Sequence, residues 1–261
     1  MNEYFDGTRV LLCLIFFIYA SWSDLKNREV SNKVWAVLAP LAFALTFSQF
    51  VLFAPEMLQN YAFSFAVTSA VSVALFYAGA FGGADAKALI CLSLALPYPI
   101  RLLQPIGFTP PLFPITVFSN AILLAASTVF YAITRNLIWR NRTGKRLFED
   151  FEEHSTIRKI LALLCGYKIN IEELESRKHS YPLEDIQVVE TGETTRKLLV
   201  FSRDEKKEEI VGRILEAREE GKLGSEVWIT PGLPLLVFIT AGLIIALTLG
   251  DIVWIVLGSI L

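Results

Sequence analysis

The stretch VWAVLAPLAFALTFSQFVLF, residues 34–53, decides the fold class, because it contains 20 consecutive residues without a charged side chain. A helix needs about 20 predominantly apolar residues to cross the hydrocarbon core of a membrane. Residues 34–53 therefore predict a transmembrane helix.

The composition of the whole chain points the same way. Hydrophobic residues make up 54% and charged residues 19% of the 261 positions, and the mean hydropathy is +0.49. These values are typical of a membrane protein with several spans. Of the 50 charged residues, 36 lie between residues 140 and 227, which predicts that this segment faces water. The net charge of -2 and the mixed signs give no reason to expect nucleic acid as a partner.

Six apolar segments are expected to form transmembrane helices. They cover approximately residues 9–22, 34–53, 61–80, 86–103, 112–139 and 232–261. The first is short, and the fourth carries Pro97 and Pro99 near its end. A signal peptide is the alternative for the first segment. We reject it because the leader contains Glu3 and Asp6 and lacks a basic cluster.

The distribution of Lys and Arg predicts the orientation in the membrane, because basic side chains concentrate in cytoplasmic connections. They occur in every second connection: Lys26, Arg28, Lys33, Lys87, Arg140, Arg142, Lys145 and Arg146. These connections are therefore expected in the cytoplasm, with both termini outside. The predicted location is the cell membrane.

The predicted fold is an all-α polytopic membrane protein with six transmembrane helices and a small α+β cytoplasmic domain inserted before the last helix. The expected domains are 1–139, 140–228 and 229–261. Within the insert, the pattern predicts a helix near 145–164, strands in the runs IQVV and RKLLVF, and a charged helix near 203–220.

Two acids interrupt the apolar pattern, one in SWSDLKNREVSN (residues 21–32) and one in FGGADAKAL (residues 81–89). A charge at the centre of a spanning helix costs about 2.5–3.5 kcal/mol, so such residues often mark function. The topology places Asp24 and Asp85 on the same membrane face, where two carboxyls could share a proton and activate water. The alternative is that each acid merely ends a helix at the water boundary.

Both stretches resemble motifs of a known family. DLKNREVSN, residues 24–32, resembles the D(I/L)xxRxIPN pattern at the first catalytic aspartate of type IV prepilin peptidases, with Ser31 in place of proline. GGADAK, residues 82–87, resembles their GxGDxK motif, with Ala84 in place of the second glycine. The resemblance covers most of the chain, including the placement of the insert as in preflagellin peptidases. It implies a GxGD membrane aspartyl protease with Asp24 and Asp85 as the catalytic pair.

Other residues are expected to shape the site. Gly82, Gly83 and the small Ala84 should let a substrate chain approach Asp85 closely. Lys87 is interpreted as a membrane anchor that does not take part in catalysis.

A short motif also precedes the last apolar run, and it is similar to the PAL-type motif of presenilin-like proteases. It consists of Pro231, Gly232, Leu233 and Pro234. A plain helix start with proline in its first turn is the alternative. Asp251, within the last run, is expected at the opposite interface.

Other chemistries find little support in the sequence. His154 and His179 lie in the insert without a HExxH arrangement, and no GxSxG stretch occurs. Cys13, Cys91 and Cys165 are isolated from one another. We therefore expect neither a metal nor a cofactor. The cysteine-rich loop of bacterial prepilin peptidases is missing, so their N-methylation activity is not expected.

The function predicted from the motifs is removal of a short leader peptide from preflagellin or pilin-like precursors at the cytoplasmic membrane face. Substrate precursor and membrane lipid are the expected partners, and the oligomeric state is not determined by the sequence. Three alternatives stay open. They are a presenilin-like or signal-peptide-peptidase-like intramembrane protease, a proton or ion transporter that uses the two aspartates, and a membrane scaffold without activity.

Overall fold

The structure is a computed structural model that describes residues 2–100, 106–151, 153–174, 176–177, 179–188, 194–199 and 207–260. The chain forms two compact units, one of residues 1–126 and 234–261 and one of residues 127–233. Helix α5 (Phe113–Thr143) begins in the first unit and ends in the second. The domain limits expected from the sequence, at 139/140 and 228/229, stay a prediction.

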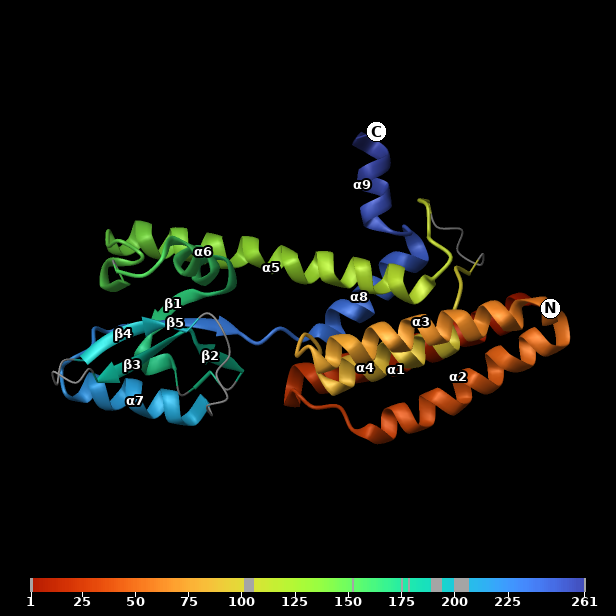
Figure 1. Ribbon diagram of the computed structural model, residues 1–261, viewed down its shortest axis with the longest axis horizontal. Helices are drawn as coiled ribbons and strands as arrows, with labels where there is room; N and C mark the ends of the chain where they lie inside the picture. The colour runs from red at the N-terminus through yellow and green to blue at the C-terminus, as the bar shows by residue number, and fades with distance from the viewer. Residues whose placement is uncertain are drawn as a thin grey trace. The chain divides into compact units, whose positions relative to one another are not determined.

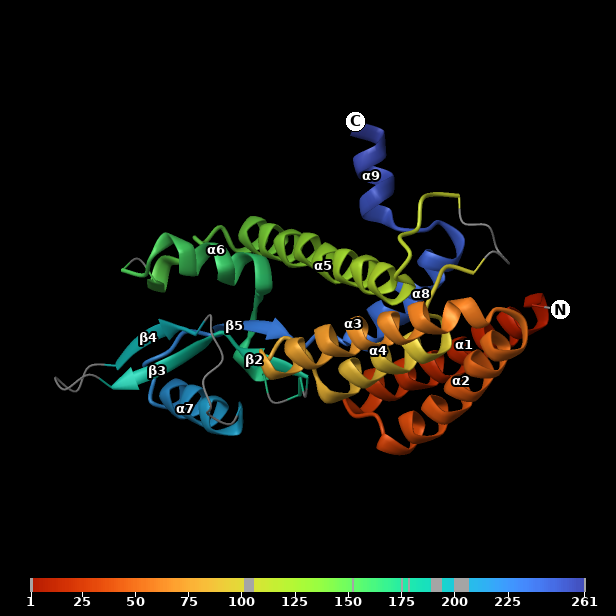
Figure 2. The same cartoon turned by 45° about the vertical axis from the view of Figure 1, so that its right-hand side comes forward.

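The first unit is a bundle of helices. Besides the start of α5 it contains α1 (Asn2–Asn27), α2 (Asn32–Phe53), the 3-10 turn η1 (Pro55–Met57), α3 (Leu58–Tyr77), α4 (Gly83–Ala95), α8 (Leu235–Thr248) and α9 (Ile252–Ile260). Helices α1 to α4 lie side by side and alternate in direction (Figure 1), and a second view shows the same arrangement (Figure 2). The end of α1 and the start of α4 therefore lie at the same end of the bundle.

Helix α3 shows why this bundle suits a membrane. It buries the polar side chains of Ser64, Thr68 and Ser72, which recur every four residues along one face. The apolar rings of Phe63 and Phe76 are exposed instead, at 62% and 43%. Small polar residues allow helices to approach closely, whereas apolar side chains face lipid. The pattern is therefore that of a helix surrounded partly by lipid.

Among the described residues, four helices are long and apolar enough to cross a membrane, and a fifth span is formed if α8 and α9 are counted as one bent segment. The expectation of six spans is therefore not confirmed. The fourth expected segment, residues 86–103, of which 101–103 lie outside the described residues, differs most, because α4 ends at Ala95. Its 13 residues reach about 20 Å, short of the roughly 30 Å of hydrocarbon. Pro97 and Pro99 disfavour its continuation as a helix.

Side chains from three other helices satisfy the buried end of α4. The carbonyl of Ala95 accepts hydrogen bonds from Arg9 Nη1 and Thr46 Oγ1, both at 3.1 Å. The carbonyl of Leu94 accepts one from the Tyr61 hydroxyl at 3.0 Å. Because the last carbonyls of a helix have no partner within it, a helix that ends inside a protein needs such donors. The positive Arg9 side chain also suits the negative end of the helix dipole.

Helix α8 packs closely on α1 and α5. Ser21 Oγ lies 3.0 Å from the carbonyl oxygen of Leu236 and 2.7 Å from Thr240 Oγ1. Gly242 lies so near α5 that an added Cβ would be 2.6 Å from the Val117 carbonyl oxygen. These contacts hold the start of α8 beside the last two turns of α1.

The last apolar run, residues 232–261, was expected to be one helix, but the structure breaks it between α8 and α9 with a bend of 55°. Gly250 has a φ of 96°, which favours glycine. Asn120 bridges the break, because it donates to the Gly250 carbonyl and accepts from the Ile252 N–H. The expected position of Asp251 at the opposite interface stays a prediction. Asp251 is only 3% exposed, and its Oδ1 accepts from the Val253 N–H as the cap of α9.

The second unit combines short strands and helices. Its elements, besides the end of α5, are η2 (Glu149–Phe151), α6 (Thr156–Cys165), β1 (Tyr167–Asn170), η3 (Ile171–Glu173), β2 (Ser180–Pro182), β3 (Glu184–Val188), β4 (Thr194–Leu198), α7 (Lys207–Glu219) and β5 (Glu226–Pro231). An antiparallel sheet has the order β1-β5-β2, and β3 pairs with β4 in a second antiparallel sheet. Val227, Trp228 and Ile229 of β5 are fully buried.

The strand-like runs and the charged helix of the insert correspond to β3, β4 and α7. Val189, Val200, Phe201 and residues 203–206 lie outside the described residues. The helix expected near 145–164 is shorter, since α6 begins only at Thr156 and is preceded by η2. Strands β1, β2 and β5 were not predicted.

Candidate active site

Asp24 lies in the last turn of α1 and is partly buried. The chain reverses directly after it. The Arg28 N–H donates to the Asp24 carbonyl at 2.9 Å, and Arg28 has a φ of 57°, which is uncommon outside glycine. Ser23 Oγ donates to the carbonyl of Glu29 at 2.8 Å and closes the turn. Asp24 is thus held by the backbone geometry that ends α1.

Asp85 lies in the first turn of α4 and is also partly buried. Its Oδ2 accepts a hydrogen bond from the N–H of Gly82, the residue that caps the helix, at 3.0 Å. A Cβ at Gly82 would lie only 3.0 Å from that same oxygen. Gly82 therefore gives the carboxyl group close access to the backbone. At Gly83 an added Cβ would meet nothing nearer than 3.7 Å, so this position tolerates a side chain.

The two carboxyl groups influence each other. Burial raises the pKa of Asp85 to about 6, the Gly82 N–H acts in the opposite direction, and the negative charge of Asp24 raises this pKa further. Such an effect requires the two acids to lie within Coulombic range. The two aspartates, 61 positions apart in the sequence, thus lie at the same end of the bundle, at the end of α1 and the start of α4 (Figure 1).

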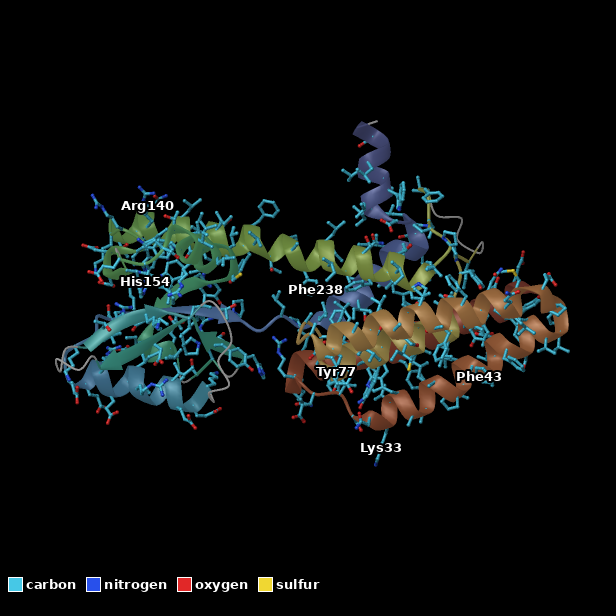
Figure 3. The ribbon with its side chains drawn as sticks, viewed as in Figure 1. Lys33, Phe43, Tyr77, Arg140, His154 and Phe238 are labelled. Atoms are coloured by element: carbon cyan, nitrogen blue, oxygen red, sulfur yellow. The ribbon has the colours of Figure 1, made fainter. Side chains whose placement is uncertain are left out.

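A third contact joins the two motif stretches. Lys87 Nζ donates to Asn32 Oδ1 at 2.7 Å, which links the fifth residue of α4 to the first residue of α2. Figure 3 labels Lys33 at the start of α2 and Tyr77 at the end of α3, at the same end of the bundle. Sequence reasoning interpreted Lys87 as an anchor and missed this contact. The sequence did offer a signal for this contact, because Asn32 and Lys87 each belong to one of the two motifs.

The Pro-Gly-Leu-Pro motif is divided between the two units. Pro231 ends β5, and the Gly232 N–H donates to the His179 carbonyl at 2.8 Å within the second unit, which also includes Leu233. Pro234 precedes α8 in the first unit, and the following turn contacts Ser21, three residues before Asp24. Of these four residues, only Pro234 is placed relative to the acids.

Ala84 completes the small residues beside Asp85. It packs against the buried core of the first unit. Ala84, which replaces the second glycine of the motif, therefore contributes its side chain to packing.

Two protein families match this chain. Residues 11–133 match the type IV leader peptidase family, and residues 158–252 match the family described as archaeal peptidase A24 C-terminus type II. The first match includes both acids and the Lys87–Asn32 contact. The second begins in α6 and ends in the first residue of α9.

Curated relatives extend over nearly the whole chain. The preflagellin peptidase of Methanococcus maripaludis is 24% identical, over 96% of this chain and 96% of its own length. The preflagellin peptidase of Methanococcus voltae is 26% identical, over 91% of this chain and 93% of its own. The preflagellin peptidase of Methanocaldococcus jannaschii is 25% identical, over 91% and 92%.

Proposed function

We propose, from the match of residues 11–133 to the type IV leader peptidase family, that this chain is a membrane-embedded aspartyl endopeptidase. Its substrates are preflagellin or pilin-like precursors, from which it removes a short leader peptide. The observation that supports the catalytic assignment is that Asp24, in the last turn of α1, and Asp85, in the first turn of α4, lie at the same end of the bundle (Figure 1) within the matched segment. The similarity to preflagellin peptidases supports the class of substrate.

The mechanism assigns different roles to the two acids. The raised pKa makes Asp85 the carboxyl that holds a proton and polarises the scissile carbonyl, and Asp24 as carboxylate takes a proton from the attacking water. Acid–base assistance of this kind contributes roughly 10²–10⁴-fold to the rate. The Gly82 N–H fixes the orientation of the Asp85 carboxyl group.

The site lies at the membrane surface. There the junction between the leader and the apolar helix of the precursor meets water, while that helix stays in lipid. Near Asp24, the exposed ring of Trp22 lies 5.2 Å from Lys26 Nζ. Aromatic rings beside basic side chains are typical of the membrane–water boundary. This supports cleavage just before the apolar helix of the precursor, whereas a presenilin-like enzyme would cut within the helix. The basic connections support the cytoplasmic face as the side of the reaction.

Replacement of either acid tests the proposal directly. Asp24→Asn and Asp85→Asn keep the size of the side chain and remove the exchangeable proton. Each single variant should lose cleavage of a preflagellin precursor by at least about a hundredfold, and the double variant should be no worse, because the acids act as a unit. Product N-termini should be sequenced after incubation with membranes that contain the full chain. An inserted single variant with most of its activity would contradict the assignment.

Matched controls come from acids at the other end of the bundle. Glu3→Gln in α1 and Glu56→Gln in η1 remove exposed carboxylates and should leave cleavage nearly unchanged. Asp251→Asn is unsuitable, because Asp251 is buried and caps α9. A transporter that uses the two aspartates would instead lose ion flux and show no precursor cleavage in the wild type.

A further inference from the structure

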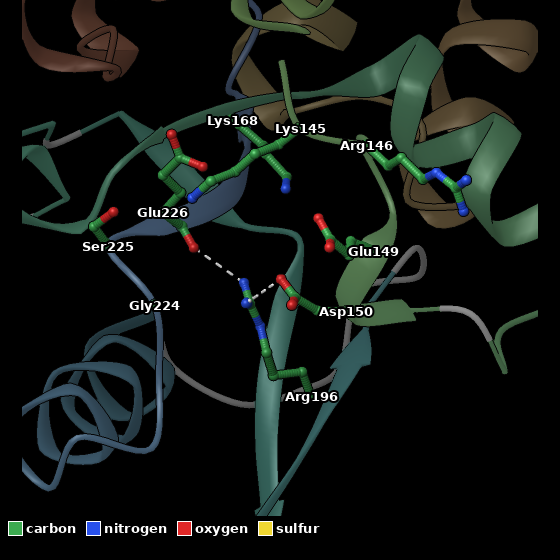
Figure 4. Close-up of a pocket in the computed structure, with 9 residues that line it drawn as sticks. All are labelled: Lys145, Arg146, Glu149, Asp150, Lys168, Arg196, Gly224, Ser225 and Glu226. Carbon is green, nitrogen blue, oxygen red and sulfur yellow. Dashed lines mark hydrogen bonds and ion pairs between the residues drawn. The ribbon is translucent and has the colours of Figure 1, made fainter. Parts of the chain in front are cut away.

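The two units hold their connecting segments in different ways. In a pocket of the second unit, Arg196 of β4 joins η2, β3 and β5 through charged and polar groups (Figure 4). It forms ion pairs with Asp150 and Glu184, at 2.7 and 2.8 Å, and donates to the Glu226 carbonyl at 3.0 Å. In the first unit, the loop between α3 and α4, which leads to Asp85, is anchored by one large apolar side chain.

This anchor is Phe81, in the stretch AGAFGGADA, residues 78–86. Every other residue of the stretch except Asp85 is glycine or alanine. Of the loop residues 78–82, all of which the structure describes, only Phe81 is buried, at 7% exposure, and the other four are exposed. Glycine leaves the backbone the most conformational freedom. The packing of the loop on the rest of the first unit therefore depends on the Phe81 side chain.

The ring of Phe81 contacts α5. Its centroid lies 5.2 Å from that of the Phe118 ring, and the two ring planes are 88° apart. This edge-to-face arrangement is favourable for aromatic pairs beyond the burial of their surface. The backbone of Phe81 is held as well, because its N–H donates to the Leu75 carbonyl of α3 at 3.2 Å. Phe81 thus connects the loop to both α3 and α5.

One peptide group connects this anchor to Asp85. The peptide that joins Phe81 to Gly82 carries the N–H that donates to Asp85 Oδ2 at 3.0 Å. Because a peptide group is planar and stiff, a displacement of Phe81 also moves this N–H. The carboxyl group lies so close to the loop backbone that a Cβ at Gly82 would be 3.0 Å from the same oxygen. The orientation of Asp85 therefore depends on where Phe81 is held.

Helix α5 is in turn connected to the helix that carries the other acid. Val117, the residue before Phe118, lies so near α8 that a Cβ on Gly242 would be 2.6 Å from the Val117 carbonyl oxygen. Ser21 of α1, three residues before Asp24, donates at 3.0 Å to a carbonyl in the first turn of α8. Helices α5 and α8 therefore form a packed connection between the loop and the end of α1.

We propose that Phe81 is a positioning residue for the two acids, because its ring contact with Phe118 holds the loop backbone that orients Asp85. This inference rests on the proposed function, in which Asp85 reacts together with Asp24. Burial and the charge of Asp24 raise the pKa of Asp85, and the Gly82 N–H lowers it. A displaced N–H therefore raises this pKa further, so that Asp85 keeps its proton to higher pH.

The kinetics of Phe81→Leu test the inference, with a preflagellin precursor as substrate and membranes that contain the full chain. Leucine keeps an apolar side chain and removes the ring. The value of kcat should fall about fivefold with KM nearly unchanged, in line with the loss of one aromatic pair. The decrease of kcat/KM at high pH should also begin at a higher pH than in the wild type.

Phe118→Leu removes the same contact from the side of α5 and leaves the loop sequence intact. It should reproduce both changes, and the double variant with Phe81→Leu should be no worse than either single one. Phe118→Leu decides the question if Phe81→Leu does not accumulate in the membrane.

Phe5→Leu is the matched control. Phe5 forms an edge-to-face pair with Phe53 of α2 at 5.8 Å, and it lies at the opposite end of α1 from Asp24. This variant should keep the kcat and the pH profile of the wild type, even if its Tm in detergent is lower. A general loss of stability would reduce the amount of active protein and leave the pH profile where it is.

Asp85→Asn in the same assay separates this inference from the proposed function. An active Asp85→Asn variant would refute the proposed function, and the role of Phe81 with it. If Asp85→Asn is inactive, wild-type kcat and pH profile in Phe81→Leu and Phe118→Leu would overturn the positioning role alone. An equal change in Phe5→Leu would overturn it as well.

Discussion

Asp85 keeps its proton to higher pH than an exposed aspartate, because burial and the charge of Asp24 disfavour its ionised form. With a pKa of about 6, the protonated fraction of Asp85 falls above that pH. If Asp85 is the acid, cleavage should decrease about tenfold per pH unit above the pKa of Asp85. Measurement of kcat/KM from about pH 4 to about pH 8 checks this. A rate that rises through neutral pH would exclude Asp85 as the acid.

Lys87 and Asn32 are expected to position the two acids. Their hydrogen bond of 2.7 Å joins the two motif stretches, and neither side chain bonds to either acid in the contacts described above. Lys87→Met and Asn32→Ala should each lower kcat by roughly fivefold, with KM nearly unchanged, since one hydrogen bond contributes about 1 kcal/mol. The double variant should resemble the single ones. If the losses in kcat added up in the double variant, or if only KM changed, Lys87 and Asn32 would have separate roles, such as contact with lipid.

Helix packing is decided by backbone approach at particular small residues. At Gly242 of α8, a Cβ would lie 2.6 Å from the Val117 carbonyl oxygen and 2.9 Å from the Ala121 nitrogen of α5. Gly242→Ala should therefore force the helices apart and destabilise the protein by about 1–3 kcal/mol. Thermal unfolding in detergent should show a lower Tm.

Gly258 of α9 is the matched control for Gly242. A Cβ there would meet nothing within 4 Å, and alanine is the better helix former. Gly258→Ala should leave the Tm unchanged or raise it slightly. An equal decrease in Tm in Gly242→Ala and Gly258→Ala would mean that the α5–α8 contact does not limit stability.

The orientation of the whole chain in the membrane can be measured with a native thiol. Cys165 is exposed, whereas Cys13 and Cys91 are buried. We expect a membrane-impermeant maleimide to label Cys165 only after the cells are opened, because the basic connections place the second unit in the cytoplasm. A Glu3→Cys variant should react on intact cells. The opposite pattern would invert the topology and place Asp24 and Asp85 outside.

The sequence by itself indicated the class of the protein and singled out Asp24 and Asp85 as the candidate catalytic pair. Apolar runs such as residues 34–53 specify a membrane helix through their length and composition, which are local properties. The motifs around Asp24 and Asp85 are also local, and they include Asn32 and Lys87. Strands β3 and β4 followed from apolar runs in a charged segment.

Only the tertiary structure decided how these parts meet. Pro97 and Pro99 already disfavour a helix beyond Ala95. The donors that satisfy the last carbonyls of α4 come from Arg9 of α1, Thr46 of α2 and Tyr61 of α3, and only the fold brings them there. Strands β1 and β2 were missed because each is short and is stabilised by pairing with β5. Asp251 became a buried cap through a bend in the last apolar run. In each case the deciding partners lie far away in sequence, and hydrogen bonding in a buried environment is a property of the folded chain.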